Sequence, residues 1–393
     1  MYKMMNFKQY RNVTRISIPN NLTLSSTSFA NSFYGMYNLK TIELSDKISN
    51  ISYLCYNCQT LTTAVCGNNV TDMGSAYQRC YNLTTAVCGN NVTNMAYSYA
   101  NCQNLTTAVC GNNVTNMVQA YQYCTNLKIA ACGENVIYMN FTYQNCTNLT
   151  TAVCGNNVTN IAYAYQFCTN LTTAACGDNV TDMSSAYRDC QTLTTAVCGN
   201  NVTDMSAAYQ NCRNLIIAAC GDNVTDMYEA YYDCQTLTTA VCGNNVTDMS
   251  YAYQNCHNLT TAVCGDNVID MSGAYKNCTN LITAVCGKSV INMYNTYDNC
   301  QNVQGNTYFY SNNISNIRRC FKGRNSSNRL NIYVHNGSAT LNTLKITNDY
   351  SLIGNNITWT DDIVTNGCYY NASYNIYIYP VVSVEEAHVV NGD

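Results

Sequence analysis

The chain has 393 residues, of which only 10% are charged, and its formal net charge is -4. This charge and the lack of a basic stripe exclude nucleic-acid binding driven by the phosphate backbone. The first residues lack the apolar stretch of a secretory signal, and no run of 18 apolar residues offers a membrane span.

Residues 1–38 are predicted to form an N-terminal capping repeat. Its strand and turn are expected at residues 16–21, with the sequence Ile-Ser-Ile-Pro-Asn-Asn, and Phe33 takes the aromatic position. A terminal repeat departs from the internal pattern because it must cover one end of the core.

Residues 39–302 contain twelve repeats of 22 residues, each opened by a leucine. One cysteine column runs from Cys58 to Cys300, and a second runs from Cys66 to Cys286 at the same period. The two columns take 23 of the 26 cysteines. A fixed period in the twenties predicts stacked units, each too small to bury its apolar side alone.

The cysteines favour free, buried thiols over the two alternatives, structural disulfides and bound metal. Cysteines at one period lie above one another at about the inter-strand spacing of 4.7–4.9 Å. Their side chains then point the same way, which does not suit the torsion of a disulfide. Small apolar thiols suit a narrow core.

The repeat 61–82 predicts a strand, a turn and a short helix. Residues 61–66 form the expected strand, and Gly67 begins a turn in which Gly and Asn tolerate positive φ. The apolar spacing of Met73, Ala76, Tyr77 and Cys80 is that of two helical turns, with Thr71 or Asp72 as the N-cap. The prediction is a leucine-rich-repeat solenoid, a right-handed α/β-type coil with one long parallel sheet and short helices on the opposite face.

The regular period ends after residue 302. Residues 303–326 are expected to form a degenerate last repeat, in which Arg324 replaces the cysteine. Residues 327–393 are expected to form a small β-rich C-terminal cap, because residues 331–335 and 374–380 alternate like strands.

The repeat resembles the BspA-like leucine-rich repeat family. Residues 245–256, Asn-Val-Thr-Asp-Met-Ser-Tyr-Ala-Tyr-Gln-Asn-Cys, resemble that family's recurring block, and residues 16–19 resemble the strand of its other variant. The resemblance covers residues 13–326. It implies a solenoid that binds proteins or cell surfaces and has no catalytic residues to transfer. Similar proteins occur on bacterial surfaces, in parasitic protists and among phage proteins.

The outward side chains of the predicted strands are the candidate binding surface. Such a column could expose more apolar area than monomers usually leave open, although β-branched residues also simply suit strands. The predicted surface consists of Thr63, Val65, Thr85, Val87, Thr107, Val109, Thr151, Val153, Thr195, Val197, Val241, Val263 and Val285.

A column of aspartates occupies the predicted helix N-cap in five successive repeats. Its members are Asp182, Asp204, Asp226, Asp248 and Asp270. Bridging by calcium is conceivable for stacked carboxylates, but Asn94, Asn116 and Asn160 fill the same position elsewhere, which favours capping. We therefore expect no metal and no other cofactor.

These patterns favour a non-enzymatic recognition or structural solenoid. We expect it in a phage virion, as a fibre or decoration component that binds a protein or cell-surface ligand, with homo-oligomerisation through the sheet face as a further expectation. The alternative is a bacterial cell-surface adhesin of the BspA-like type, and the third class is an ice- or glycan-binding threonine ladder. An enzyme is the least expected class, because His257, His335 and His388 have no nucleophile at a recognisable spacing.

Overall fold

The structure is a computed structural model that describes residues 12–108, 110–130 and 132–391. The chain divides into two compact units, residues 1–193 and 194–393, and each is described by itself. The limits that we predict for the capping repeats and the C-terminal cap are not the limits of these units, and they stay a prediction.

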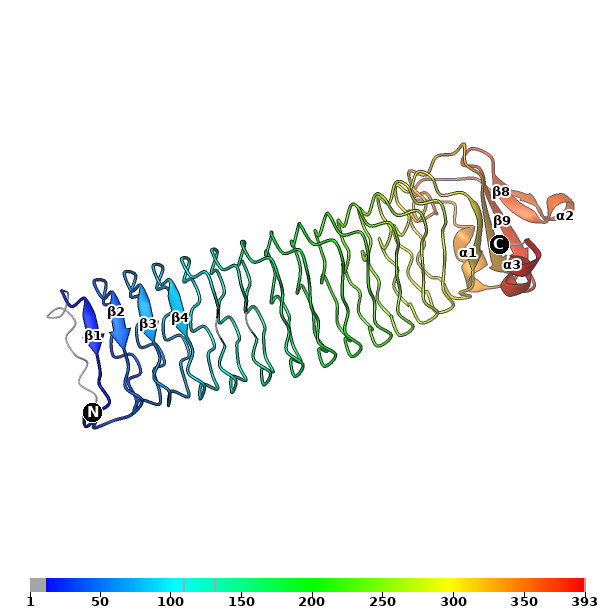
Figure 1. Cartoon of the computed structure of the whole chain (residues 1–393). Helices are drawn as coiled ribbons and strands as arrows, with labels where there is room; N and C mark the ends of the chain where they lie inside the picture. The colour runs from blue at the N-terminus through cyan, green and yellow to red at the C-terminus, as the bar shows by residue number, and fades with distance from the viewer. Residues whose placement is uncertain (1–11, 109, 131, 392–393) are drawn as a thin grey trace. The chain divides into compact units, whose positions relative to one another are not determined.

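The first unit carries the predicted parallel sheet. Its strands β1 (Arg15–Ser17), β2 (Thr41–Glu43), β3 (Thr63–Val65) and β4 (Thr85–Val87) follow one another in chain order and pair in parallel. Figure 1 shows them stacked side by side. Thr63 pairs with Thr85 across β3 and β4, so equivalent positions of successive repeats lie next to each other. Later repeats keep this register through isolated backbone pairings such as Thr107 with Ile129 and Thr151 with Thr173.

A second ladder of parallel pairings follows the polar position ahead of the turn segment. In the first unit it passes from Asp72 to Asn94 and Asn116, and later from Asn160 to Asp182. Each coil is therefore joined to the next at two places. The predicted solenoid with a parallel sheet is confirmed, and its right-handed sense stays a prediction.

The predicted short helices are wrong, because the second half of each repeat forms two consecutive β-turns. Ala76 donates its backbone N–H to Met73 O at 3.0 Å, and Cys80 donates to Tyr77 O at 3.1 Å. The third residue of each turn has a left-handed conformation, with φ of 55° at Ser75 in the first turn and 64° at Arg79 in the second. A left-handed third residue is the mark of a type II turn. The described helices lie outside the repeats, in the C-terminal part of the chain.

The spacing of the coils explains why turns replace helices. A helix with its side chains is about 10–12 Å wide, whereas neighbouring strands are about 4.8 Å apart. Consecutive β-turns are flat, so the coils can stay about 4.8 Å apart on the face opposite the sheet as well. Every second N–H of the turn segment is then donated to the next coil, as from Ser75 to Ala96 O at 2.8 Å and from Tyr77 to Ser98 O at 2.9 Å.

The predicted helical stripe is nevertheless the core. Met73, Ala76, Tyr77 and Cys80 are fully buried, as are the equivalent side chains of most other repeats. The tyrosine rings stack on one another in both units, with centroids 5.3 to 5.6 Å apart. Burial of the two ends of each turn needs the same i, i+3, i+4, i+7 spacing as two turns of helix, so the pattern alone does not separate the two structures.

Glycine at the predicted loop is required by close packing and not by positive φ. The glycine column, which includes Gly67, Gly89 and Gly243, has no left-handed member among the described repeats. A Cβ on Gly89 would lie 2.8 Å from Gly67 O, and a Cβ on Gly243 would lie 2.5 Å from the oxygen of the preceding glycine. The predicted turn is present, because Val70 donates its N–H to Gly67 O at 3.3 Å, but the positive φ expected there is wrong. The glycine lets adjacent coils approach.

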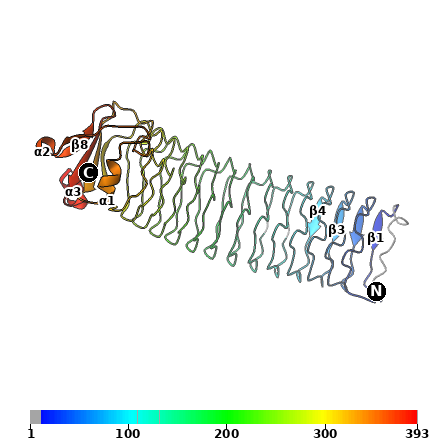
Figure 2. The same ribbon diagram turned by 180° about the vertical axis from the view of Figure 1, so that it is seen from behind.

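The second unit continues the repeats and ends in a five-stranded sheet with the order β5-β6-β9-β8-β7. Strands β5, β6 and β9 pair in parallel, and β9, β8 and β7 pair antiparallel. Helices α1 and α3 contact the parallel part of this sheet. Figures 1 and 2 show both helices beside the sheet from opposite sides. The elements are β5 (Gly305–Phe309), β6 (Leu330–His335), α1 (Ala339–Leu344), β7 (Thr360–Asp362), α2 (Ile363–Asn366), β8 (Cys368–Asn371), β9 (Ile376–Val381) and α3 (Val384–Asn391).

Arg324, at the position where the cysteine is lost, joins the last repeat to this sheet. The residue is 9% exposed, and its guanidinium donates to the backbone oxygens of Val303, Asn328 and Tyr374. Burial lowers the pKa of Arg324 to about 10. A long side chain with several donors can tie three segments together, which a thiol cannot.

Candidate surface of the sheet

The strand segment of each repeat alternates between core and solvent. In the repeat that contains β3, Leu61, Ala64 and Cys66 are buried, with exposed fractions of 0%, 1% and 6%. Thr63 is half-buried and Val65 is exposed. This is the alternation expected of a strand with one covered face, and it places the predicted surface on the open face.

The predicted valines differ in exposure along the chain. Val65 and Val87 are each 40% exposed, whereas Val241, Val263 and Val285 are half-buried. The other two described members, Val153 and Val197, are exposed at 39% and 36%. Val109 lies outside the described residues. The open valines are thus those of the earlier repeats.

The predicted threonines are more uniform. Thr85, Thr107, Thr151 and Thr195 are all exposed, and only Thr63 is half-buried. The threonine that precedes this column uses its hydroxyl within the solenoid, as Thr84 Oγ1 donates to Thr62 O at 3.1 Å. One threonine of each pair is therefore open, and the other partly serves the stacking of the coils.

Sequence reasoning missed the most exposed apolar side chains of this face. Isoleucine replaces threonine at Ile129, which is 60% exposed, and at the consecutive pair Ile216 and Ile217, exposed at 48% and 55%. Ile282 is 44% exposed in the same way. The signal was a departure from the repeat: β-branched apolar residues stand where the other coils carry threonine. With these residues, the face is apolar as well as hydroxylated.

Tyrosine hydroxyls support the strand from the core side. Tyr275 Oη donates to Val263 O at 2.6 Å and accepts the Val263 N–H at 2.9 Å. Tyr297 does the same for Val285, with a donated bond of 2.8 Å and an accepted bond of 2.9 Å. One hydroxyl thus pairs with both the N–H and the C=O of a valine that lies outside the strands β1 to β9. These backbone groups are therefore satisfied without a neighbouring strand.

The aspartate column caps turns and not helices. Asp248 Oδ1 accepts the backbone N–H of Ser250, two residues on, at 2.8 Å, and Asp204 does the same for Ser206 at 2.9 Å. Asparagine fills the position equally, and Asn292 donates from Nδ2 to Asp270 Oδ2 at 3.0 Å. Asp182 accepts from Asn160 in the same way, at 2.9 Å. The helix N-cap that we predict is wrong, but the preference for short acceptor side chains is explained.

The carboxylates of this column do not gather into a cation site. Burial, followed by the charges of Asp204 and Asp248, raises the pKa of Asp226. Among the described residues, no group of three or more His, Cys, Asp or Glu side chains could hold a metal ion.

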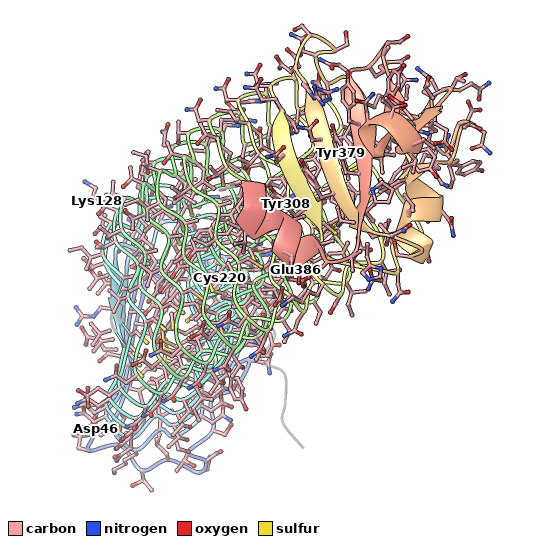
Figure 3. All side chains as sticks on the ribbon, turned by 90° about the vertical axis from the view of Figure 1, so that its right-hand side faces the viewer. Asp46, Lys128, Cys220, Tyr308, Tyr379 and Glu386 are labelled. Atoms are coloured by element: carbon pink, nitrogen blue, oxygen red, sulfur yellow. The ribbon has the colours of Figure 1, made fainter. Side chains whose placement is uncertain are left out.

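The structure places no disulfide within either cysteine column among the described residues. In the first column the thiol donates to a carbonyl of the preceding coil, as from Cys146 Sγ to Tyr121 O at 3.2 Å. Burial raises the pKa of Cys124 to about 12. In the second column, Cys220 faces the interior (Figure 3), and burial raises its pKa to about 12. Thiols held in the protonated form are poor nucleophiles and poor metal ligands.

The histidines are dispersed. His257 lies beside Asn277 O, with 2.9 Å between Nδ1 and the oxygen, and His388 stacks on Tyr308 with ring centroids 4.4 Å apart. His388 Nδ1 also lies 2.6 Å from the hydroxyl of Tyr310. His335 ends β6. These contacts are those of packed side chains, and none pairs a histidine with a nucleophile.

No helix in the described part of the chain combines the length and the apolar character that a membrane crossing requires.

Comparison with known proteins identifies the repeats. The model of the BspA type leucine rich repeat region matches residues 3–106, 75–194, 162–282 and 230–359. No curated protein matches the chain. A leucine-rich repeat protein of Bacteroides ovatus has a similar structure with a TM-score of 0.57 and 14% identity, over 75% of this chain and 86% of that one. A leucine-rich cell surface protein of Faecalibacterium prausnitzii gives 0.43 and 19%, over 75% and 87%. The chain belongs to the BspA-type leucine-rich repeat family.

Proposed function

We propose that this protein is a non-enzymatic recognition solenoid that binds a protein or cell-surface partner through the open face of its sheet. The observation that carries the proposal is the exposure of β-branched side chains at the same two positions of successive coils. Val65, Val87, Val153 and Ile129 leave between 39% and 60% of their surface open.

The side chains on the open face of the sheet suit a flat contact from which water is excluded. The first two strands carry charged side chains on this face. From β3 to the last regular repeat, the two outward positions of the strand segments carry mainly Thr, Val and Ile. Removing such side chains from water is favourable in proportion to the apolar area, and the low charge leaves little desolvation to overcome. Because these side chains repeat at the strand spacing, a partner with a regular surface can make many weak contacts at once. The combined affinity then exceeds that of any single contact.

Two settings fit this role. We place the protein first in a phage virion, as a fibre or decoration component, and second on a bacterial surface as an adhesin. The same face can serve both, because each setting offers repeated protein or envelope surfaces. Immunogold labelling of purified virions and of intact cells distinguishes the two settings.

The test replaces three open valines by lysine, in the combined variant Val65→Lys, Val87→Lys and Val153→Lys. Three charges on the dry face should weaken self-association or binding to host cells at least about tenfold, which corresponds to about 1.4 kcal/mol. Binding is measured by cell pull-down, and self-association is measured by light scattering.

The matched control adds the same charge elsewhere, in Gln103→Lys, Gln191→Lys and Asn214→Lys. These three side chains are exposed outside the strand segments. The control should behave like the wild type. If the valine variant binds and associates as tightly as the control, the sheet face is not the contact surface.

A further inference from the structure

The C-terminal sheet carries a cavity that the repeat architecture does not account for. It is an open hollow at the surface and not an enclosed pocket, with a volume of about 510 Å³. It lies where the end of α1, the segment before β7, and the strands β7 and β8 meet. The lining includes Lys345, Thr347, Ile357, Trp359, Asp361 and Tyr369.

The backbone holds these side chains together. Asp361 on β7 and Tyr369 on β8 are directly paired across the two antiparallel strands. Ile357 donates its N–H to Thr347 O at 2.9 Å, which closes the opposite side of the cavity. The site is therefore held by backbone pairings, and its residues come from three short stretches of the chain, 345–347, 357–361 and 369.

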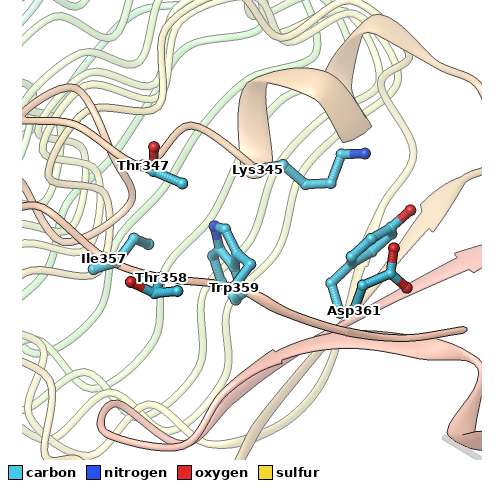
Figure 4. Close-up of a pocket in the computed structure, with 7 residues that line it drawn as sticks. Lys345, Thr347, Ile357, Thr358, Trp359 and Asp361 are labelled. Atoms are coloured by element: carbon cyan, nitrogen blue, oxygen red, sulfur yellow. The ribbon is translucent and has the colours of Figure 1, made fainter.

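One buried donor in the wall lacks an acceptor. The indole Nε1 of Trp359 is buried and has no hydrogen-bond partner in the structure. Figure 4 shows this nitrogen directed toward the side of the cavity where Thr347 and Lys345 lie. A buried donor without a partner is costly, so a small displacement of the indole that brought this nitrogen to a ligand oxygen would be favoured.

The remaining groups define the ligand. Lys345 Nζ lies 4.5 Å from the ring centroid of Tyr369, so its charge rests against an aromatic face while its N–H groups stay available as donors. Asp361 supplies acceptor oxygens of opposite charge, and Trp359 and Tyr369 supply apolar faces. A wall with one cation and one anion does not select a charged ligand. It suits a neutral ring that has C–H groups on its face and hydroxyls around its rim.

We infer that this cavity binds a monosaccharide, either free or as the terminal residue of a glycan. The aromatic rings pack against its C–H face, Trp359 Nε1 and Lys345 Nζ donate to its hydroxyl oxygens, and Asp361 accepts from its hydroxyl groups. The site is separate from the open sheet face of the repeats, so failure of either proposal leaves the other standing.

Tryptophan fluorescence tests the inference directly, because Trp359 is the one tryptophan of the chain. The methyl glycosides of glucose, galactose, mannose and N-acetylglucosamine are each titrated to about 100 mM, which detects dissociation constants in the millimolar range. At least one should give a saturable change in emission that glycerol at equal hydroxyl concentration does not give. A glycan array with the same chain then separates a free sugar from a terminal residue.

Asp361→Asn should weaken this binding about tenfold or more, because it removes the charged acceptor but keeps the shape. Asp349→Asn, which removes the same charge from an exposed position outside the lining, should leave it unchanged. Lys345→Gln gives a second variant if the first fails to fold, as judged by circular dichroism. The absence of a saturable change with all four glycosides overturns the inference, and so does a change that neither Asp361→Asn nor Lys345→Gln weakens.

Discussion

At the scale of single residues, the tyrosine column explains how the strand segments satisfy their backbone groups although few of them form regular strands. The rings stack in the core, and the hydroxyls reach the backbone of the strand segment on the other side of the same coil. Tyr165 Oη donates to Val153 O at 2.5 Å in this way. Phenylalanine would fill the ring position equally well but would leave the valine carbonyl without a partner.

Replacing Tyr165 by phenylalanine should therefore lower the free energy of unfolding by about 1–2 kcal/mol. The control is Tyr77→Phe in the same unit, because the Tyr77 hydroxyl is buried without a hydrogen-bond partner. This second change should be neutral or slightly stabilising. Urea denaturation followed by circular dichroism measures both, and equal losses in the two variants would contradict the role of the hydroxyl.

At the scale of the structural element, each repeat places two left-handed residues four positions apart in its turn segment. The residues at the first of these positions include Ser75, Gln119, Ala207 and Glu229, with φ between 51° and 55°. A left-handed conformation costs an L-residue about 1–2 kcal/mol. The inter-coil bonds and the buried turn ends offset this cost in every repeat.

Two opposite substitutions at this position test the turn. Ala207→Gly should raise the free energy of unfolding by about 1 kcal/mol, because glycine adopts φ of 51° without strain. Gly273→Ala should lower it by about 1–3 kcal/mol, since the new Cβ would lie 2.5 Å from the ring of Tyr251 and φ is 61°. Thermal unfolding measures both. Opposite signs support the turns, and a loss in Ala207→Gly would instead indicate a helix.

The fold was predictable where it depends on period and alternation, and not where two structures share one pattern. Leu61, Ala64 and Cys66 point inward as their spacing predicts, and equivalent residues of successive repeats pair. The spacing of Met73, Ala76, Tyr77 and Cys80 suits consecutive β-turns as well as a helix, and serine at the left-handed position carries no signal for positive φ. The spacing between neighbouring strands decides between a helix and β-turns, and the sequence of a single repeat does not reveal that spacing.

The candidate sites show the same limit. The outward positions of the strand follow from alternation, but the graded exposure of Val65 and Val285 depends on how each coil packs. The isoleucines of the face were visible as departures from the repeat. The hollow beside Trp359 was not predictable, because its lining comes from three stretches between residues 345 and 369 that only the fold of the C-terminal sheet brings together.

At the scale of the whole molecule, the two cysteine columns predict that alkaline pH unfolds the protein. Burial raises the pKa of Cys110 to about 12 and that of Cys132 to about 11, from an ordinary value of 9.0. Between pH 9 and 12 the unfolded chain releases protons that the folded chain keeps. The stability is then complete below pH 9 and falls as pH rises, by up to about 1.4 kcal/mol per pH unit for each such thiol.

Urea midpoints from pH 7 to pH 11 measure this dependence. The midpoint should stay nearly constant up to pH 8, where thiols are protonated in both states, and should fall steeply above pH 9. A midpoint at pH 11 equal to that at pH 8 would show that the thiols are not buried when the protein is folded.

The central claim is that successive coils stack with residues 22 apart in contact, and one exposed ion pair tests it most directly. Lys288 Nζ lies 3.0 Å from Asp266 Oδ2 in the preceding coil. Zero-length carbodiimide coupling followed by peptide mass spectrometry should join Lys288 to Asp266, and Asp266→Asn should abolish that product. Coupling of Lys288 to Asp222, three repeats away, without any product at Asp266 would contradict the stacking.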